Sequence, residues 1–336
     1  MESLINKGWG GVWGRVPSPS VIASAAVPIA HVVRGGVVES VHHGHVVGLD
    51  ATGGVAVRAG DVDVTLFARS SLKPLQAVAM LRSGLELDDD LLALACASHN
   101  GEPAHLEGAR RILAGAGVGE AALQNTPDLP LDAASSLAWR SESRGPASIT
   151  QNCSGKHAAM LATCVAAGWD IQTYRSPDHP LQVAIRGVIT ELTGDPVEHT
   201  TVDGCGAPLY SCTLAGLARA FSRIASAPAG TAEGRVASAM SSHPFMVGGT
   251  GRDVTSLMAG VPGLVAKDGA EGVYACGLPD GRAVALKVLD GSQRPRPVVM
   301  VAALRALGVD APALSEVGRV PVLGHGEPVG QVEPLL

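Results

Sequence analysis

The chain has 336 residues, of which 46% are apolar and 17% are charged, and its net charge is −6 at pH 7. This balance is typical of a globular protein with a substantial core. The negative charge and the scarcity of aromatic residues (three Phe, three Tyr and four Trp) argue against nucleic-acid binding. No run of about 18 uncharged apolar residues is present, so the sequence predicts no membrane span.

The first 26 residues are rich in Gly, Pro and Ser, and they predict a flexible tail ahead of a folded region that starts at residue 27. The segment VIASAAVPIA matches a signal peptide poorly, because its apolar part is short and is broken by Pro28. Six cysteines are scattered without close pairs, which favours reduced thiols and a cytoplasmic location: Cys96, Cys153, Cys164, Cys205, Cys212 and Cys276.

β-Structure is predicted near both ends of the folded region. Residues 27–61 contain short β-branched runs separated by Gly-Gly, His-Gly and Thr-Gly-Gly, a pattern typical of antiparallel hairpins. Within it, HHGH places His43 and His45 on one strand face and His42 on the other, which suits no compact metal site and predicts surface histidines. A second β-like block covers residues 263–291, with turn signals at Asp268-Gly269 and Asp280-Gly281.

Helical patterns fill the middle of the chain. One begins near Ser70, and others cover residues 87–98, 105–117, 155–168, 180–194 and 214–226. Strands at both ends with helices between them predict a mixed α+β fold rather than strict βαβ alternation. We expect a sheet built from the two terminal portions, with a possible helical lobe at about residues 85–240.

The first chemical feature is the segment RSSLKPLQA, residues 69–77. Residues i and i+3 share a helix face, so Ser70 and Lys73 would lie together while Ser71 points elsewhere. A desolvated, neutral lysine can take the proton of a serine nucleophile. The alternative is a serine that caps the helix and a lysine in solvent, and S-x-x-K alone does not decide between them.

Four further segments hold reactive side chains in loops or at helix starts. SHNGE begins at Ser98, and it could equally supply only a cap and a turn. NCSGKHAAML and DGCGAP each place one cysteine, Cys153 and Cys205, in a Gly-containing loop. These two could hold a soft metal such as zinc, although two buried thiols are the simpler interpretation. In KDGAEG, Lys267 stands at the end of an apolar run, and its side chain could face inward or reach solvent.

Together, RSSLKPLQA, SHNGE, NCSGKHAAML, DGCGAP and KDGAEG resemble the asparaginase II family, the thermolabile or Rhizobium etli-type L-asparaginases, and they occur in the family's order. The resemblance covers residues 27–336. It implies a sheet with a helical lobe beside it, as in serine β-lactamases and glutaminases. It also implies a homodimer that hydrolyses L-asparagine to L-aspartate and ammonia.

The resemblance also implies roles for individual residues. Two Ser–Lys tandems would be Ser70 with Lys73 and Ser98 with Lys267, with Ser70 the favoured nucleophile. A zinc ion would be held by Cys153, Lys156 and Cys205. A charged substrate also needs counter-charges, so Arg69 is the candidate to bind its α-carboxylate and Asp203 its α-ammonium, and His157 is another candidate contact.

Two alternatives remain open at this point. A glutaminase or another Ser–Lys amide hydrolase would use the same residues, and one extra methylene in the substrate changes binding by only about 1–3 kcal/mol. A β-lactam-recognising enzyme is disfavoured, because no S-D-N occurs and KDG stands where K-T-G is expected. A non-catalytic, zinc-stabilised binding protein would need the cysteines but not the two serines.

Overall fold

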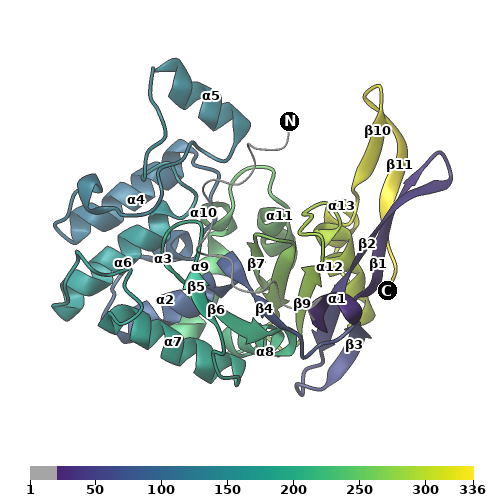
Figure 1. Cartoon of the computed structure of the whole chain (residues 1–336), viewed down its shortest axis with the longest axis horizontal. Coiled ribbons are helices and arrows are strands. Elements are labelled where there is room, and N and C mark those ends of the chain that lie inside the picture. The colour runs from purple at the N-terminus through teal and green to yellow at the C-terminus, as the bar shows by residue number, and fades with distance from the viewer. Residues whose placement is uncertain (1–20) are drawn as a thin grey trace, which may run out of the picture.

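The computed structural model describes residues 21–336, so most of the predicted 1–26 tail lies outside the described residues. Figure 1 shows a helical lobe on one side and a β-sheet on the other. All pairings in the sheet are antiparallel, in the order β10-β11-β1-β2-β9-β8-β7, with β3 added beside β2. Its strands are β1 (Val27–Arg34), β2 (Val37–Leu49), β3 (Val55–Ala59), β7 (Val265–Gly269), β8 (Val273–Gly277), β9 (Ala283–Val288), β10 (Pro321–Gly324) and β11 (Glu327–Pro334).

The helical lobe is formed by chain segments between the two halves of the sheet. It contains a 3-10 turn η1 (Arg69–Leu72) followed by α2 (Lys73–Arg82), α3 (Asp89–Ala95), α4 (Pro103–Gly115), α5 (Ala133–Ser141), α6 (Ser154–Ala167), α7 (Pro180–Thr193) and α9 (Ala232–Ser242). A small sheet in the order β4-β6-β5 lies beside it, made of β4 (Thr65–Phe67), β5 (Thr200–Val202) and β6 (Pro208–Thr213). The predicted mixed α+β class, with a sheet built from both terminal portions beside a helical lobe, is confirmed.

Two helices pack against the sheet. Helix α8 (Leu214–Ala225) packs on β2, β8 and β9, and α12 (Arg296–Ala306) packs on β9 and β11. Of these two, α8 also contacts α7 and α9 of the lobe. In α8 the apolar side chains recur at helical spacing, so Leu214, Leu217, Phe221 and Ile224 are all buried. The Thr213 side chain caps the helix by accepting from the Gly216 N–H. The remaining elements are α1 (Val21–Ser24), η2 (Glu120–Ala122), α10 (Pro244–Val247), α11 (Asp253–Gly260) and α13 (Pro312–Val317).

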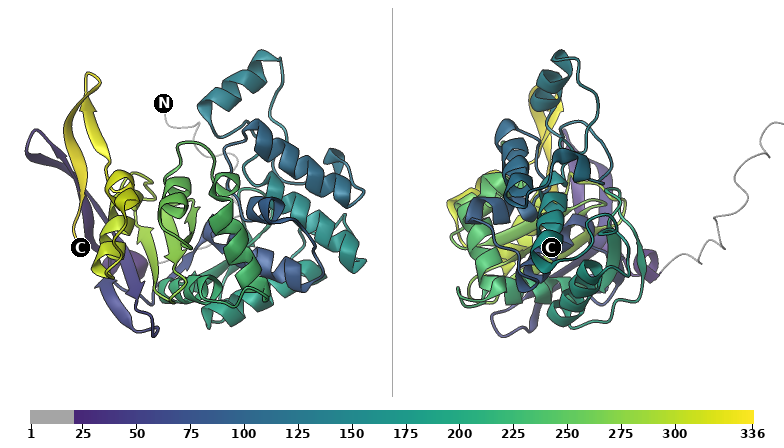
Figure 2. Two further views of the ribbon diagram at one scale, coloured as in Figure 1. Left: turned by 180° about the vertical axis from the view of Figure 1, so that it is seen from behind. Right: turned by 90° about the vertical axis from the view of Figure 1, so that its left-hand side faces the viewer.

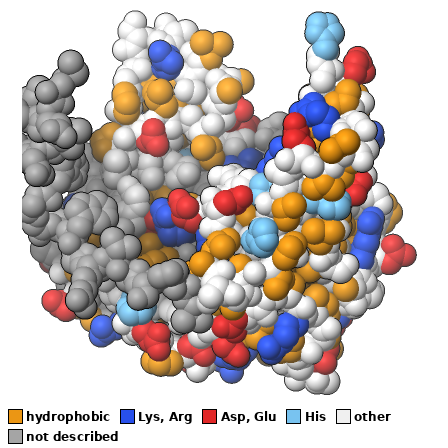
Figure 3. All heavy atoms as spheres, turned by 45° about the vertical axis from the view of Figure 1, so that its right-hand side comes forward, with side chains coloured by type: hydrophobic (Ala, Val, Ile, Leu, Met, Phe, Trp, Pro, Cys, Tyr) orange, Lys and Arg blue, Asp and Glu red, His pale blue; other side chains and the backbone are white. Residues whose placement is uncertain are grey.

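The β1–β2 and β10–β11 hairpins extend beyond the body of the molecule (Figure 2). Their outer parts carry exposed apolar side chains, among them Val37, Val38 and Leu323. Figure 3 views this side, where hydrophobic side chains lie among charged ones. Among residues 21–336, no helix is long and apolar enough to cross a membrane.

Two sequence predictions in the first hairpin are wrong. The expected turn at His43-Gly44 lies inside β2, where Gly44 lets the strand approach β9: a Cβ there would sit 2.2 Å from the Lys287 carbonyl oxygen. His45 is fully buried rather than on the surface. Its Nε2 hydrogen-bonds the Ile22 carbonyl at 2.8 Å, and its Nδ1 accepts from the Asp61 N–H.

Candidate active site

Three loops meet beneath the sheet edge and are joined by backbone hydrogen bonds. The Ser98 N–H donates to the Val247 carbonyl at 3.1 Å, and the Asn100 N–H donates to the Gly248 carbonyl at 2.9 Å. Between them, the His99 N–H donates to the Asn152 carbonyl at 3.1 Å. The SHNGE segment is therefore fixed between the NCSGKH segment and the loop that follows α10.

A cavity of about 430 Å³ lies at this junction. Both predicted serines, Ser70 and Ser98, line it, together with polar side chains from four other segments. The start of α5 forms another part of the wall through Leu131, Asp132 and Ala133. Its polar lining also includes Asn100, Asn152, Thr250, Arg252, Asp268 and Gln293. The structure thus brings the two serines to one small, polar chamber.

Ser70 lies in the 3-10 turn η1, ahead of α2. Close packing of η1 against the end of β7 depends on Gly269, since a Cβ there would come 2.7 Å from the Ala68 carbonyl oxygen. The Ser71 hydroxyl points away from the cavity, as predicted, and donates to the Lys267 carbonyl at 3.0 Å. Among the described residues, none hydrogen-bonds the Ser70 hydroxyl, so that hydroxyl is available to a ligand.

Lys73 is buried at the first turn of α2, and Pro74 occupies the position where its missing N–H has no cost. Its Nζ donates to the Ser98 Oγ at 3.0 Å, to the Cys153 Sγ at 3.0 Å and to the Ala97 carbonyl. The structure therefore pairs Lys73 with Ser98, and it records no hydrogen bond from Lys73 to Ser70 in the part of the chain described.

Lys267 is fully buried on β7 and faces inward. Its Nζ contacts the Asp268 Oδ1 at 2.5 Å and the Asp268 carbonyl at 2.7 Å, and no hydrogen bond joins it to Ser98 among the described residues. Burial lowers the pKa of Lys267 to about 8, with the Lys73 charge acting in the same direction and Asp268 opposing it. A lysine with this pKa is available as a neutral amine near physiological pH.

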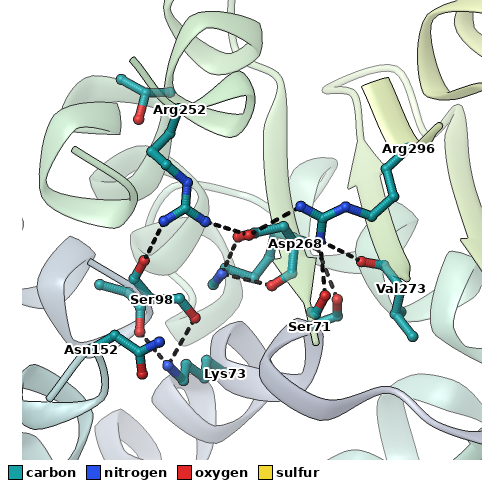
Figure 4. A network of polar contacts seen from close by, with 12 residues as sticks. Ser71, Lys73, Ser98, Asn152, Arg252, Asp268, Val273 and Arg296 are labelled. Atoms are coloured by element: carbon teal, nitrogen blue, oxygen red, sulfur yellow. Dashed lines mark hydrogen bonds and ion pairs between the residues drawn. The ribbon is translucent and has the colours of Figure 1, made fainter. Parts of the chain in front are cut away.

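The Asp268 carboxylate lies between the side chains of Arg252 and Arg296 (Figure 4), and it also contacts Lys267. Its Oδ2 accepts from Arg252 at 2.6 Å, and Arg296 lies 3.7 Å from the same oxygen. Burial alone would raise the pKa of Asp268, but Lys267, Arg252 and Arg296 hold it well below its usual range. The carboxylate therefore stays ionised beside the cavity.

The three predicted zinc ligands lie together at the start of α6 and in the loop before β6. Lys156 Nζ is 3.2 Å from the Cys205 Sγ, and Cys153 and Cys205 form one small buried cluster with Ala207. A hydrogen bond from the Cys153 thiol and the nearby Lys156 charge lower the pKa of Cys205 to about 4, against the effect of burial. The hydrogen bond to Cys205, and then burial, raise the pKa of Cys153 to about 12.

Close packing fixes the start of α6, and with it Cys153 and Lys156. A Cβ at Gly155 would lie 2.6 Å from both the carbonyl oxygen and the Cγ of Leu94, so glycine is the residue that fits here without a shift of Leu94. Within residues 21–336, no group of three or more His, Cys, Asp or Glu side chains could hold a metal. A metal at this cluster would therefore require the lysine amine as a third donor.

The predicted substrate-binding residues lie apart from the walls of the cavity. Arg69 Nε donates to the Asp203 Oδ1 at 2.7 Å, so the two side chains neutralise each other. Arg69 has φ +52°, a left-handed conformation that is strained for arginine. His157 is fully buried, and its Nδ1 hydrogen-bonds the Tyr174 hydroxyl at 2.8 Å. Burial lowers the pKa of His157 well below its usual value.

Sequence reasoning missed several polar residues of the cavity. Arg252 lies in the glycine-rich segment GGTGRD, for which the sequence predicted no role in the site. Asp268 follows Lys267 directly, but it carried only a turn signal. No local pattern connects these residues to Ser98, because the contacts that join them span 154 and 16 positions of the chain. The one sequence signal that could have indicated Arg252 as a cavity residue is its position directly after a glycine-rich turn.

Comparison with known proteins identifies the family of this chain. The sequence model of the L-asparaginase II family matches residues 30–334, nearly the whole chain. No curated protein matches the sequence. Family membership defines the class of protein, an amidohydrolase, and this chain belongs to the L-asparaginase II family.

The chain is also distantly similar to solved structures. A β-lactamase from Mycobacterium bovis has 14% identity and a TM-score of 0.46, with 79% of this chain and 95% of that chain covered. EstCE1, a hydrolase with promiscuous acyltransferase activity, has 12% identity and a TM-score of 0.39, with coverages of 85% and 96%. A Bacillus glutaminase has 13% identity and a TM-score of 0.27, with coverages of 74% and 84%.

Proposed function

We propose that this protein is an L-asparaginase, which hydrolyses the side-chain amide of L-asparagine to L-aspartate and ammonia. Membership of the L-asparaginase II family supports the reaction class. The observation that carries the proposal is the contact between Lys73 Nζ and the Ser98 hydroxyl in a cavity that Ser70 also lines. A hydroxyl, a buried amine and a second hydroxyl are the groups that acyl transfer requires.

In the proposed first half-reaction, the Ser70 oxygen attacks the side-chain amide carbon of asparagine. An ester bond forms to Ser70, and the carbon–nitrogen bond then breaks to release ammonia. Lys73 in its neutral form would take the Ser70 proton after a rotation of its side chain away from Ser98. Lys73 would then turn back to the Ser98 hydroxyl, which it bonds in the structure, and give Ser98 a proton as Ser98 passes its own to the leaving nitrogen.

In the proposed second half-reaction, a water molecule attacks the ester carbon, and its proton returns through Ser98 and Lys73 to the Ser70 oxygen. The products are L-aspartate and the free enzyme. Lys267 would tune Ser98 from beneath the cavity wall rather than by direct contact, since its amine is bonded to Asp268. Its lowered pKa, about 8, is close to the working pH, so that both its charged and its neutral forms are populated there.

Zinc is proposed as the metal of this site, held by Cys153, Lys156 and Cys205. The donors fit it, because two thiolates and a nitrogen are ligand types that zinc prefers. The low pKa of Cys205 supplies one thiolate, whereas nearby thiolate charge raises the pKa of Lys156 against the effect of burial. Lys156, and Cys153 whose pKa is raised to about 12, must therefore each lose a proton on binding. When bound, the metal would supply positive charge that orients substrate.

Arg69 and Asp203 are retained as proposed contacts for the α-carboxylate and the α-ammonium of the substrate. Their mutual ion pair would have to open as substrate enters, each side chain exchanging its partner for a substrate charge. His157 is also retained as a proposed substrate contact, and its ring would have to turn away from the Tyr174 hydroxyl that it now bonds. We also propose that the enzyme is a cytoplasmic homodimer.

The test is ammonia release from L-asparagine and, in parallel, from L-glutamine, using the zinc-loaded full chain. Activity on asparagine that exceeds activity on glutamine would support the proposal. Preference for glutamine would make the protein a glutaminase with the same residues. No ammonia from either amide would overturn the proposal and favour a zinc-stabilised binding protein.

A further inference from the structure

Arg252 occupies a position between two parts of the cavity that are far apart in sequence. It directly precedes α11, and its side chain extends between the SHNGE loop and β7 (Figure 4). Its Nη1 lies 3.4 Å from the Ser98 carbonyl oxygen and 3.4 Å from the Asn100 Oδ1. Its Nη2 donates to the Asp268 Oδ2 at 2.6 Å. Of the described residues, it alone has a side chain that hydrogen-bonds both Ser98 and Asp268.

We propose that Arg252 is a positioning residue: by holding the Ser98 backbone and one oxygen of Asp268 together, it fixes the place and the charge of the Lys267 amine beneath the cavity. This inference rests on the proposed hydrolysis, in which Lys267 tunes Ser98. It assigns a role to a residue outside both Ser–Lys pairs and outside the cysteine cluster.

The two oxygens of the Asp268 carboxylate have different partners. Lys267 contacts Oδ1 at 2.5 Å, while Arg252 contacts Oδ2 at 2.6 Å. With Oδ2 engaged by the guanidinium, the carboxylate cannot rotate to offer both oxygens to the lysine. The planar, forked guanidinium can also reach the Ser98 carbonyl at the same time, which a lysine ammonium at this position could not do in the same geometry.

Arg296 is close to the same carboxylate but does not have this role. It is 3% exposed, and it donates to the Gly269 and Val273 carbonyls at 2.8 and 3.4 Å. Its distance to the Asp268 Oδ2 is 3.7 Å, longer than a hydrogen bond. Arg296 therefore supports the end of β7, and within residues 21–336 only Arg252 connects the carboxylate to the serine loop.

The charges around Lys267 determine the direction in which its pKa moves when Arg252 is lost. Asp268 on its own strand favours the ammonium form, whereas Lys73 from α2 and Arg252 from the loop before α11 disfavour it. The Cys96 thiol, at the end of α3, also faces this group, and burial raises its pKa to about 12, so it stays neutral. Behind Asp268 lie Arg296 and Asp253, and burial raises the pKa of the Asp253 carboxyl. Loss of Arg252 therefore removes one positive charge and releases Oδ2 to the lysine.

The experiment compares wild type with Arg252→Gln and Arg252→Lys, with Arg305→Gln, an exposed arginine on α12, as the matched control. The first readout is the pH dependence of kcat/KM for L-asparagine. The second does not need activity: the chain has only five lysines (Lys7, Lys73, Lys156, Lys267 and Lys287), so ¹³C-labelled lysine side chains can be titrated individually by NMR.

For Arg252→Gln we expect the Lys267 titration and the limb of the rate profile that follows it to move upward together, by about one pH unit. The rate below that limb falls about tenfold. Arg252→Lys keeps the charge, so the titration stays close to wild type while kcat falls, because an ammonium cannot hold both partners. Arg305→Gln matches wild type in both readouts.

Two results would overturn the proposal. One is a loss of activity in Arg252→Gln with an unchanged Lys267 titration, which indicates general damage to the loop. Another is full kcat in Arg252→Lys, which removes the need for a bridge. Should Arg252→Gln fail to fold, the Arg252→Lys result alone still decides. Wild type that releases no ammonia would defeat the proposed hydrolysis, whereas the NMR titrations would still test the role of Arg252.

Discussion

Lys73 Nζ lies 3.0 Å from the Oγ of Ser98, although Ser70 is the serine one helical turn away from it in the sequence. Ser70 and Lys73 would share a helix face only in a regular helix that begins at Ser70. Residues 69–72 form a 3-10 turn instead, and α2 begins only at Lys73. The lysine side chain is thereby directed toward the SHNGE loop. One buried amine serves as a link between two hydroxyl-bearing segments.

This link predicts that Lys73→Met abolishes most of the activity. The substitution keeps the volume of the side chain but removes the proposed base, so we expect kcat to fall by about 10²–10⁴-fold. The measurement is ammonia release from L-asparagine, with circular dichroism to establish that the variant is folded. Lys287→Met, which removes a lysine outside the cavity, is the matched control and should retain full activity. Equal losses in both variants would argue against a specific role for Lys73.

The lowered pKa of Lys267 predicts how stability depends on pH. In the folded chain its pKa is about 8, against an ordinary value of 10.5 that the unfolded chain recovers. Between these two values the unfolded chain binds more protons, so this group makes the folded state more stable as the pH rises. Urea unfolding at pH 7.5 to 10 should show wild type gaining stability relative to Lys267→Met. A constant difference across that range would contradict the buried, neutral lysine.

The cysteine cluster predicts metal-dependent stability. A ligand that binds only the folded state stabilises it by about 3 kcal/mol at a concentration about 100 times its Kd. We therefore expect zinc to raise the Tm of wild type and a chelator to reverse the gain. Cys205→Ala should abolish both the bound zinc, measured by elemental analysis, and the shift in Tm. Cys212→Ala, which removes a buried thiol of β6 that lies outside the cluster, should leave both unchanged.

The packing of Gly155 predicts a large stability difference between two similar substitutions. Gly155→Ala places a Cβ 2.6 Å from the Leu94 carbonyl oxygen, so α3 and α6 must separate, at a cost of roughly 1–3 kcal/mol. Gly187→Ala, in α7 with nothing within 4 Å of the new Cβ, should instead stabilise by up to about 1 kcal/mol. Denaturant unfolding measures both. Similar effects from the two variants would show that α3 and α6 do not pack as described.

Local signals in the sequence predicted much of the fold. The helices at Lys73–Arg82, Ser154–Ala167 and Leu214–Ala225 follow apolar spacing that can be read directly from the chain. The turn after Asp280 was predicted from Asp-Gly. The helix α5 was missed, because none of its residues is buried and so no apolar stripe marks it. The strand β2 was divided wrongly at Gly44, where glycine serves a close strand contact rather than a turn.

The candidate site was predicted unevenly, for a similar reason. Ser70 and Ser98 were identified from ordered motifs, and both line the cavity. Which amine meets which hydroxyl depends on how loops far apart in the chain are joined, and no spacing rule specifies that. Arg252 was missed because its importance comes from the two partners that it joins, Ser98 and Asp268, and not from its own neighbours in sequence.

The most direct test of the account is ammonia release from L-asparagine by wild type, Ser70→Ala and Ser98→Ala, all loaded with zinc. We expect wild type to be active and both serine variants to lose at least about 10³-fold in kcat. A burst of ammonia without turnover in Ser98→Ala, and none in Ser70→Ala, would assign the covalent bond to Ser70. Full activity in Ser70→Ala would contradict the proposed nucleophile, and wild type without activity on either asparagine or glutamine would contradict the account as a whole.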